Sequence, residues 1–200
     1  MHAIQKLTEL LADMPGVGPR QARRIVHFLL RATPSFRNSL AESIRTLAEN
    51  VAQCKACFRY DEVNNDGRCA LCANKNREKS TLTVVEKDVD VEGIESVGFY
   101  TGAYFVLGSL IPLTEYRKRA LAPRTQELFA RLATDTAVTE VVLAFATTPE
   151  GDYTAQELKQ MIREKKPDMR VSMLARGLSL GAEIEYADQE TLRNAFRGRA

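Results

Sequence analysis

The stretch CKACFRYDEVNNDGRCALC, residues 54–72, contains all four cysteines of this 200-residue chain. Two Cys-x2-Cys pairs supply the four thiolates of a closed, tetrahedral zinc site. The residues between the pairs have too few apolar side chains for a core, and zinc binding contributes about 10–16 kcal/mol to the folding of finger-sized segments. A redox Cys-x2-Cys motif normally occurs once, and disulfides would be reduced in a cytoplasm. We therefore expect one structural zinc ion per chain, bound by Cys54, Cys57, Cys69 and Cys72.

Basic side chains surround these cysteines. They could line a polyanion, or they could be the ordinary solvated surface of a small zinc-binding segment, and the sequence leaves both interpretations open. The residues concerned are Lys55, Arg59, Arg68, Lys75, Arg77 and Lys79.

The part of the chain before the cysteines repeats its apolar residues at helical spacing. We expect a helix from Ile4 onward, a second after Pro19, and a third after the capping box Ser39-Leu-Ala-Glu42. Residues 1–52 are therefore predicted to be all helical.

The part after the cysteines alternates between apolar runs and helical patterns. The runs predict strands at residues 82–85, 104–107, 141–145 and 171–174, several of them buried on both faces. The helical patterns lie near residues 91–95, 125–133 and 156–165, the last following the capping box Thr154-Ala-Gln-Glu157. This alternation predicts a mixed α/β fold with a mostly parallel sheet. The expected domains are a helical domain at 1–52, a four-cysteine zinc finger at 53–79, an α/β domain at 80–177 and a C-terminal segment at 178–200.

The distribution of charged and apolar residues indicates which ligand and which cellular location to expect. The net charge is only +2, but residues 1–80 hold 13 basic and 8 acidic side chains, so we expect nucleic-acid contacts to begin there. A signal peptide has a basic segment followed by an apolar one, and the start of the chain does not show this pattern. The longest charge-free run, residues 96–114, is interrupted by glycine and proline, unlike a membrane span. We expect a cytoplasmic protein.

A glycine turn joins the first two predicted helices. In Met14-Pro-Gly16-Val-Gly18-Pro-Arg20, the two glycines leave backbone N–H groups uncovered at a helix N-terminus, where a phosphate is stabilised. The following helix carries several arginines and no acid between Pro19 and Arg31. An ordinary connector with solvated arginines is the alternative. We expect DNA contacts from Gly16, Gly18, Arg20 and Arg24, with Arg23 and Arg31 as secondary candidates.

Acidic residues follow two of the predicted strands. Glu86 ends the first strand, and Glu150 and Asp152 follow the strand at 141–145. Carboxylates at the carboxyl ends of neighbouring parallel strands can form a magnesium site. Alternatively, Glu150 and Asp152 simply complement the dipole of the next helix. The residues alone do not decide between the two.

The ordered set of motifs resembles the RecR family of bacterial recombination mediators. A glycine hairpin of the helix–hairpin–helix type, a four-cysteine knuckle and an α/β part opening with Val84-Val-Glu86 occur in that order. The α/β part is similar to a Toprim domain, as found in topoisomerases and primases. The resemblance also includes Gly102-Ala-Tyr-Phe-Val-Leu107 and Gly181-Ala-Glu-Ile-Glu185. The chain departs from the family's usual loops at 114–119 and 146–149.

The resemblance implies a function in DNA repair. It implies a homotetrameric ring or clamp on DNA that assists recombinase loading together with the mediator proteins RecO and RecF, in the cytoplasm and associated with the nucleoid. Toprim enzymes carry a first-strand glutamate, matched by Glu86, and two later aspartates, whose positions hold Ala146 and Thr148. Two-metal phosphoryl transfer needs several fixed carboxylates. We therefore expect no catalytic residue and no Mg²⁺, and the acidic edge formed by Glu86, Glu150 and Asp152 is a candidate site for a partner protein.

Two other functions stay open at this point. One is a Toprim-type nuclease or nicking enzyme that uses magnesium held by Glu86, Asp88, Asp90, Glu150 and Asp152. The other is a zinc-ribbon adaptor that binds only proteins, in which case its arginines are merely solvated.

Overall fold

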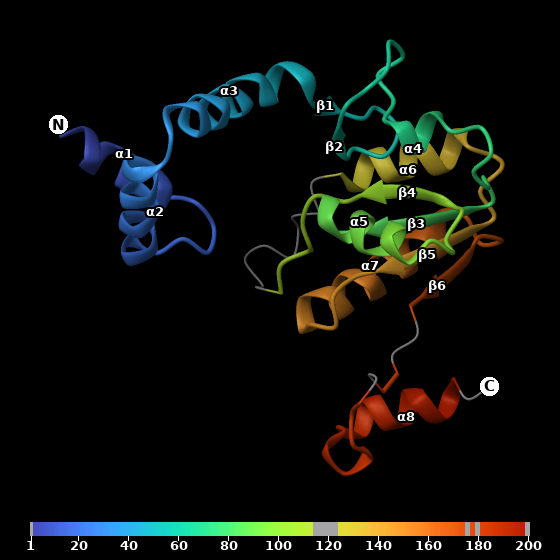
Figure 1. Ribbon diagram of the computed structural model, residues 1–200. Helices are drawn as coiled ribbons and strands as arrows, with labels where there is room; N and C mark the ends of the chain where they lie inside the picture. The colour runs from blue at the N-terminus through green and yellow to red at the C-terminus, as the bar shows by residue number, and fades with distance from the viewer. Residues whose placement is uncertain (1, 114–123, 175–176, 179–180, 199–200) are drawn as a thin grey trace. The chain divides into compact units, whose positions relative to one another are not determined.

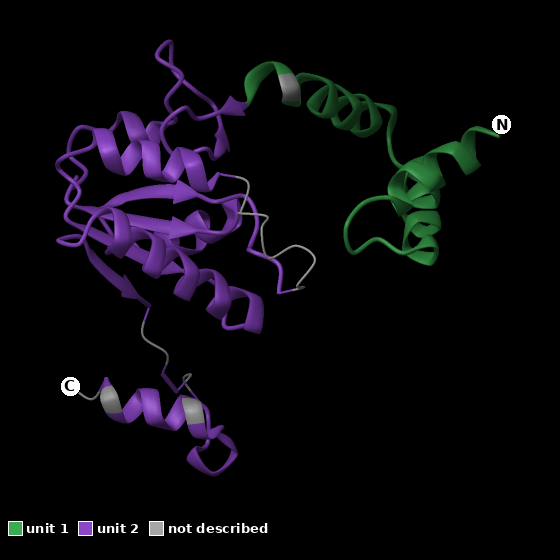
Figure 2. Cartoon of the chain, turned by 180° about the vertical axis from the view of Figure 1, so that it is seen from behind, with its two compact units in different colours: residues 1–51 green, residues 52–200 purple. Residues whose placement is uncertain are grey.

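The computed structural model describes residues 2–113, 124–174, 177–178 and 181–198 (Figure 1). The chain divides into two compact units, Met1–Val51 and Ala52–Ala200 (Figure 2). The altered loop at 114–119 lies outside the described residues. Within the described ranges, no helix combines the length and the apolar character needed to cross a membrane.

The first unit consists of the three predicted helices. They are α1 (Ala3–Ala12), α2 (Pro19–Arg31) and α3 (Pro34–Asn50). Among its described residues only Ala22 and Val26, both on α2, are buried. The unit therefore covers very little of its own apolar surface.

The predicted start of the third helix is wrong. α3 begins at Pro34 rather than after Ser39. The side chain of Thr33 accepts a hydrogen bond from the backbone N–H of Phe36 at 3.3 Å, and Pro34 occupies the first helical position, where its missing N–H costs nothing. The box at 39–42 therefore lies inside a helix that has already begun.

The second unit opens with the cysteine segment, residues 53–79. Short strands β1 (Ala52–Gln53) and β2 (Tyr60–Asp61) pair antiparallel, and helix α4 (Ala70–Ala73) follows. An isolated bridge joins Val63 to Cys69. Each Cys-x2-Cys knuckle (residues 54–57 and 69–72) is closed by a backbone hydrogen bond, from Phe58 N–H to Cys54 C=O and from Ala73 N–H to Cys69 C=O, both at 2.9 Å.

A four-stranded parallel sheet is the centre of the second unit (Figure 1). The strand order is β4-β3-β5-β6, and every neighbouring pair is parallel, which confirms the predicted sheet. Each strand coincides with one of the four apolar runs to within one residue at either end. Their bounds are β3 (Thr81–Val85), β4 (Ala103–Val106), β5 (Glu140–Ala144) and β6 (Arg170–Met173).

Alternate residues of the strands enter two separate clusters. On one face, Leu82 and Val84 of β3 pack with residues of α6 (Thr125–Thr134) and α7 (Pro149–Lys165). On the other face, Val85 packs with α5 (Asp88–Val97) and with three of the cysteines. The period of two places successive side chains on opposite faces, so the cysteine segment is part of the core of this unit. The chain ends with a 3-10 turn (Ile184–Tyr186) and α8 (Gln189–Arg197).

The predicted start of α7 is also wrong. The helix begins at Pro149, whereas the sequence predicted a start after Thr154. The Thr148 side chain accepts a hydrogen bond from Gly151 N–H at 3.1 Å, so Thr148 and Pro149 again form a capped, proline-led start. Glu150 and Asp152 consequently lie in the first turn of α7.

Candidate nucleic-acid interface and metal centre

The glycine turn between α1 and α2 is exposed at both of its glycines. Gly16 has φ +77°, a conformation that side-chain-bearing residues rarely adopt, and Val17 N–H closes the turn on Met14 C=O at 3.0 Å. Gly18 caps α2 with an ordinary φ of −77°, and a Cβ placed there would meet nothing within 4 Å. The backbone conformation of the turn thus accounts for the glycine at position 16. The conformation at position 18 does not require a glycine, and the missing side chain leaves the backbone exposed at the N-terminus of α2.

The arginines of α2 lie on its exposed side. Ala22 and Val26 are buried and Ile25 and Leu29 are half-buried, which is the apolar side expected for this helix. The exposed arginine side chains of α2, here called the arginine face, form no ion pair with any residue that the structure describes. They are Arg20, Arg23, Arg24 and Arg31.

A further arginine of this unit has a different task. Arg37, on α3, donates from Nη1 to the carbonyl of Ala32 at 2.6 Å and to that of Leu29 at 3.2 Å. It therefore satisfies carbonyls at the C-terminal end of α2, where a cation also complements the helix dipole. Sequence reasoning missed this contact because the two residues are on different helices.

The four cysteines form a compact cluster. Their sulfur atoms all lie within 4.8 Å of one another, and three of the four residues are buried. Cys69 N–H donates to the Sγ of Cys54 at 3.3 Å, and the sulfurs of Cys57 and Cys69 are 3.7 Å apart. Among the described residues this is the one group of three or more potential ligands that could hold a metal ion. Four thiolates so arranged fit the closed tetrahedral shell of zinc.

The thiols of the cluster differ in their acidity. The pKa of Cys54 is far below its usual value, because the side chains of Cys57, Cys69 and Cys72 hydrogen-bond to its thiolate. The pKa of Cys72 is raised, because its side chain hydrogen-bonds to those of Cys54, Cys57 and Cys69. A divalent cation at the centre would let all four sulfurs be thiolates.

Two of the basic residues around the cysteines are held within the fold. Arg77 donates to both carboxylate oxygens of Glu95, at 3.0 and 2.7 Å, and its guanidinium lies 5.3 Å from the ring centroid of Tyr104. The pKa of Glu95 is lowered, chiefly by Arg77, and burial raises the pKa of Tyr104, whose hydroxyl donates to Glu95. Arg59 pairs with Asp61. Both arginines therefore form ion pairs that stabilise the fold, and we do not count them among the contacts for a polyanion.

The acidic residues do not gather into a cluster within the described part of the chain. Glu86 follows β3 and pairs with Lys87 at 3.3 Å. Glu150 is exposed and Asp152 is half-buried in the first turn of α7. This arrangement fits the dipole interpretation of the two α7 carboxylates.

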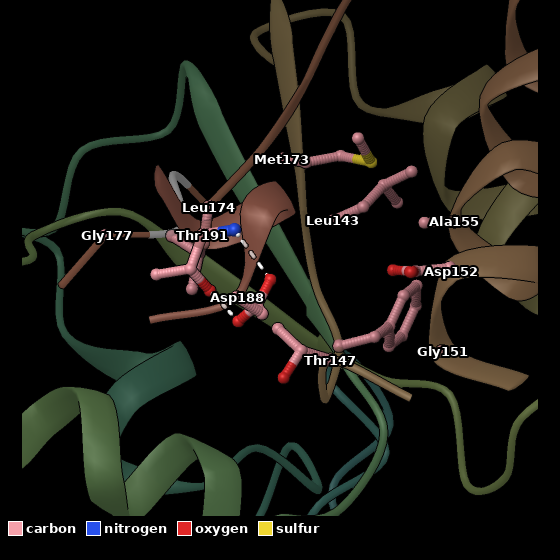
Figure 3. Close-up of a pocket in the computed structure, with 11 residues that line it drawn as sticks. Leu143, Thr147, Gly151, Asp152, Ala155, Met173, Leu174, Gly177, Asp188 and Thr191 are labelled. Carbon is pink, nitrogen blue, oxygen red and sulfur yellow. Dashed lines mark hydrogen bonds between the residues drawn. The ribbon is translucent and has the colours of Figure 1, made fainter. Parts of the chain in front are cut away.

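A cavity of about 470 Å³ lies beyond the carboxyl ends of β5 and β6 (Figure 3). Asp152 and Thr147 line it from the α7 side, and Asp188 and Thr191 from the C-terminal segment. The Asp188 carboxylate accepts hydrogen bonds from the N–H and the hydroxyl of Thr191, at 2.9 and 2.6 Å, and thereby caps the start of α8. Sequence reasoning named Asp152 but not the residues that face it from the C-terminal segment.

Comparison with known proteins gives matches along nearly the whole chain. Family models described as "RecR, helix-hairpin-helix", "Toprim domain" and "RecR, C-terminal" match residues 4–48, 80–175 and 177–200. Similar proteins named "Recombination protein RecR" include one from Dehalococcoides mccartyi, 38% identical over 98% of this chain and 93% of the relative. Another, from Nocardioides sp., is 40% identical over 98% and 95%. A third, from Cutibacterium acnes, is 40% identical over 98% and 94%.

Proposed function

Because this chain belongs to the RecR family, we propose that it is a DNA-binding recombination protein that acts as a mediator in DNA repair. Membership confirms the resemblance drawn from the residue motifs. A role in recombination follows from the name that the relatives share. The contacts with DNA and with other proteins are argued below from the residues.

The observation that carries DNA binding is the combination of an open Gly18 with an unpaired arginine face. The backbone N–H groups at the start of α2 and the guanidinium groups of Arg20 and Arg24 together offer donors and positive charge to a phosphate. Such contacts recognise the sugar–phosphate backbone and not the base sequence. Binding should therefore be independent of sequence and strongly dependent on salt.

The test is a double substitution, Arg20→Ala with Arg24→Ala, measured by fluorescence anisotropy on a labelled duplex at several salt concentrations. We expect roughly a tenfold or greater loss of affinity and a shallower salt dependence, because two phosphate contacts are lost per chain. The matched control, Arg45→Ala with Arg163→Ala, removes the same charge from exposed positions on α3 and α7. An equal loss in both double variants would show that net charge, not the arginine face, governs binding.

The cysteine cluster is proposed to hold one structural Zn²⁺ per chain. All four potential ligands are cysteines, three of them buried and one half-buried. A ligand set made only of thiolates favours zinc over harder metals. With four protein ligands no position remains for a substrate, so the ion would stabilise the fold and supply no chemistry to a reaction. Elemental analysis of the purified protein tests this directly, with one zinc per chain as the expected result.

We further propose that the protein is not an enzyme. Ala146 and Thr148 stand where a Toprim enzyme would carry two aspartates, so the acidic edge lacks the ligands for two-metal chemistry. Incubation of supercoiled plasmid with the protein and Mg²⁺ or Mn²⁺ tests the nuclease alternative. Nicking that disappears in Glu86→Gln would establish the enzyme instead.

An assembly of several copies is the last part of the proposal. The first unit leaves large apolar side chains exposed on all three helices, including Leu10, Phe28 and Ile44. A homotetrameric ring or clamp would cover such surface and would sum the phosphate contacts of several arginine faces. RecO and RecF are the proposed partner proteins, with the acidic edge as a candidate contact, and the proposed location is the cytoplasm, on the nucleoid.

A further inference from the structure

The free edge of the sheet at β4 is closed by groups that do not belong to a strand. β4 has a neighbouring strand, β3, on one side only. On its other side, Val106 N–H donates to Cys57 C=O at 2.8 Å, and the Val106 carbonyl accepts from Arg124 Nη1 at 2.9 Å. The Tyr104 carbonyl accepts from Arg131 Nη1 at 2.8 Å. These contacts occupy backbone groups that an open edge would offer to another chain.

The first cysteine knuckle reaches both faces of the sheet at this edge. Cys57 packs in the cluster that contains Tyr104 and Val106, whereas Phe58 packs on the opposite face against Phe105, with ring centroids 5.3 Å apart. Phe58 has φ +63°, the one positive φ among the described residues other than glycine. A phenylalanine adopts this conformation only where surrounding contacts impose it. The knuckle is therefore held by the sheet as well as by its own sulfurs.

Arg131 joins the knuckle to the strand directly. The same Nη1 atom donates to the carbonyl of Ala56 at 2.8 Å and to that of Tyr104 at 2.8 Å. Ala56 immediately precedes the ligand Cys57, so this side chain fixes the backbone on which a ligand is mounted. Arg124 adds a second contact, because its guanidinium lies 5.6 Å from the ring centroid of Phe58.

We propose that Arg131 is a positioning residue that couples the cysteine metal site to the edge of the sheet. It holds the knuckle in the geometry that retains the metal, and the metal in turn keeps the knuckle seated over β4. By thermodynamic linkage the coupling is mutual. If the hydrogen bonds of Arg131 strengthen metal binding, the bound metal strengthens the contact between the knuckle and β4 by the same factor. The inference rests on the metal binding proposed above and is independent of DNA binding.

The first experiment measures metal release. Zinc-loaded wild type, Arg131→Met and Arg131→Lys are mixed with a chromogenic chelator, and the rate of zinc transfer is followed by absorbance. We expect about tenfold faster release from Arg131→Met, equivalent to about 1.4 kcal/mol. Arg131→Lys should recover much of the wild-type rate, because an ammonium group can still donate to carbonyls. Arg163→Met, at an exposed position on α7, is the matched control and should release zinc at the wild-type rate.

The second experiment uses wild-type protein alone and so does not depend on how a variant folds. Hydrogen exchange is measured by mass spectrometry before and after zinc removal. We expect faster exchange in the segment 103–107, which contains β4, and little change in the segment 140–144, which contains β5. Equal acceleration in both segments would indicate general unfolding and would overturn the coupling.

The outcomes separate this inference from the proposed metal site. Wild type that binds no metal would refute the metal site and the coupling together. Zinc-loaded protein whose Arg131→Met variant releases metal at the wild-type rate would refute the coupling alone. A lysine variant as fast as the methionine variant would also contradict it, since the loss would then reflect packing rather than the hydrogen bonds to Ala56 and Tyr104.

Discussion

Among the described glycines, Gly151 leaves the least room for a side chain. A Cβ built on it would lie 2.0 Å from the carbonyl oxygen of Ala146, a backbone atom that cannot turn aside. Gly151 N–H is also the donor to the Thr148 side chain that caps α7. The close approach of the 146–148 loop to the first turn of α7 therefore requires a residue without a side chain.

Gly151→Ala should destabilise the protein by roughly 2–4 kcal/mol, because the loop and the helix start must move apart. The matched control is Gly93→Ala inside α5, where a Cβ would meet nothing within 4 Å. That change should stabilise by about 0.5–1 kcal/mol, since alanine restricts the unfolded chain. Urea unfolding followed by circular dichroism measures both. Similar effects of the two substitutions would mean that the 146–151 approach is looser than the structure shows.

At the scale of elements, the buried hydroxyl of Thr154 ties a helix to a distant loop. Its Oγ1 donates to the carbonyl of Glu150 at 2.7 Å within α7 and accepts from Ile111 N–H at 2.8 Å. Thr154 is fully buried and Ile111 is 3% exposed. The hydroxyl thus satisfies a backbone N–H that would otherwise lie unpaired in the interior.

Thr154→Val should cost roughly 1–3 kcal/mol, because the shape is preserved while the buried N–H of Ile111 loses its acceptor. Thr134→Val is the control, since the Thr134 hydroxyl lies at the exposed C-terminal end of α6 and bonds only within the helix. That change should stay within about 0.5 kcal/mol. Thermal unfolding and hydrogen exchange of the segment 108–112 provide the readouts. Unchanged exchange in that segment would contradict a stabilising hydrogen bond between Ile111 N–H and Thr154 Oγ1.

The elements also show what the sequence could predict. Strands of a parallel sheet contain apolar runs, so all four are predicted to within one residue at either end, including β6, which is exposed at both of its ends. The predicted starts of α3 and α7 are wrong, because a capping-box pattern can occur inside a helix. In both cases the true start is a threonine followed by proline, Thr33-Pro34 and Thr148-Pro149. A threonine–proline pair is therefore the better local signal for the start of a helix in this chain.

The candidate sites were predictable to different degrees. The cysteine cluster follows from spacing alone, because four close thiols have few other uses. The contacts of Arg131 with Ala56 and of Arg37 with Ala32 could not be predicted, since they join residues from separate elements. Spacing within a helix says which side chains share a face, but not which distant carbonyls that face will meet.

At the scale of the whole molecule, the two units differ sharply in how much apolar surface they bury. The second has two clusters of buried side chains, whereas the first buries only Ala22 and Val26 among its described residues. A helical segment of this size gains most of its stability by covering its apolar side. The exposed apolar residues of α3, among them Leu40 and Ile44, are therefore the proposed contacts between copies.

Leu40→Glu with Ile44→Glu should dissociate the assembly into smaller species, because two charges on successive turns of α3 would enter the contact. Native mass spectrometry reports the number of chains, and elemental analysis of the variant should give the same metal content per chain as wild type. Lys159→Gln with Arg163→Gln, on α7, lowers the net charge by the same two units and should leave the assembly intact. An unchanged number of chains in the α3 variant would exclude this face from the contact.

The contacts of the first knuckle with β4 have a consequence for the order of events during biosynthesis. Translation delivers Cys72, the last sulfur, before Tyr104 and Val106, and Arg131 later still. The proposed site is therefore complete before the strand and the arginine that contact the knuckle have left the ribosome. Under the proposed coupling, a metal bound at that moment would exchange faster than in the finished chain, and this rate would fall only when synthesis has passed α6.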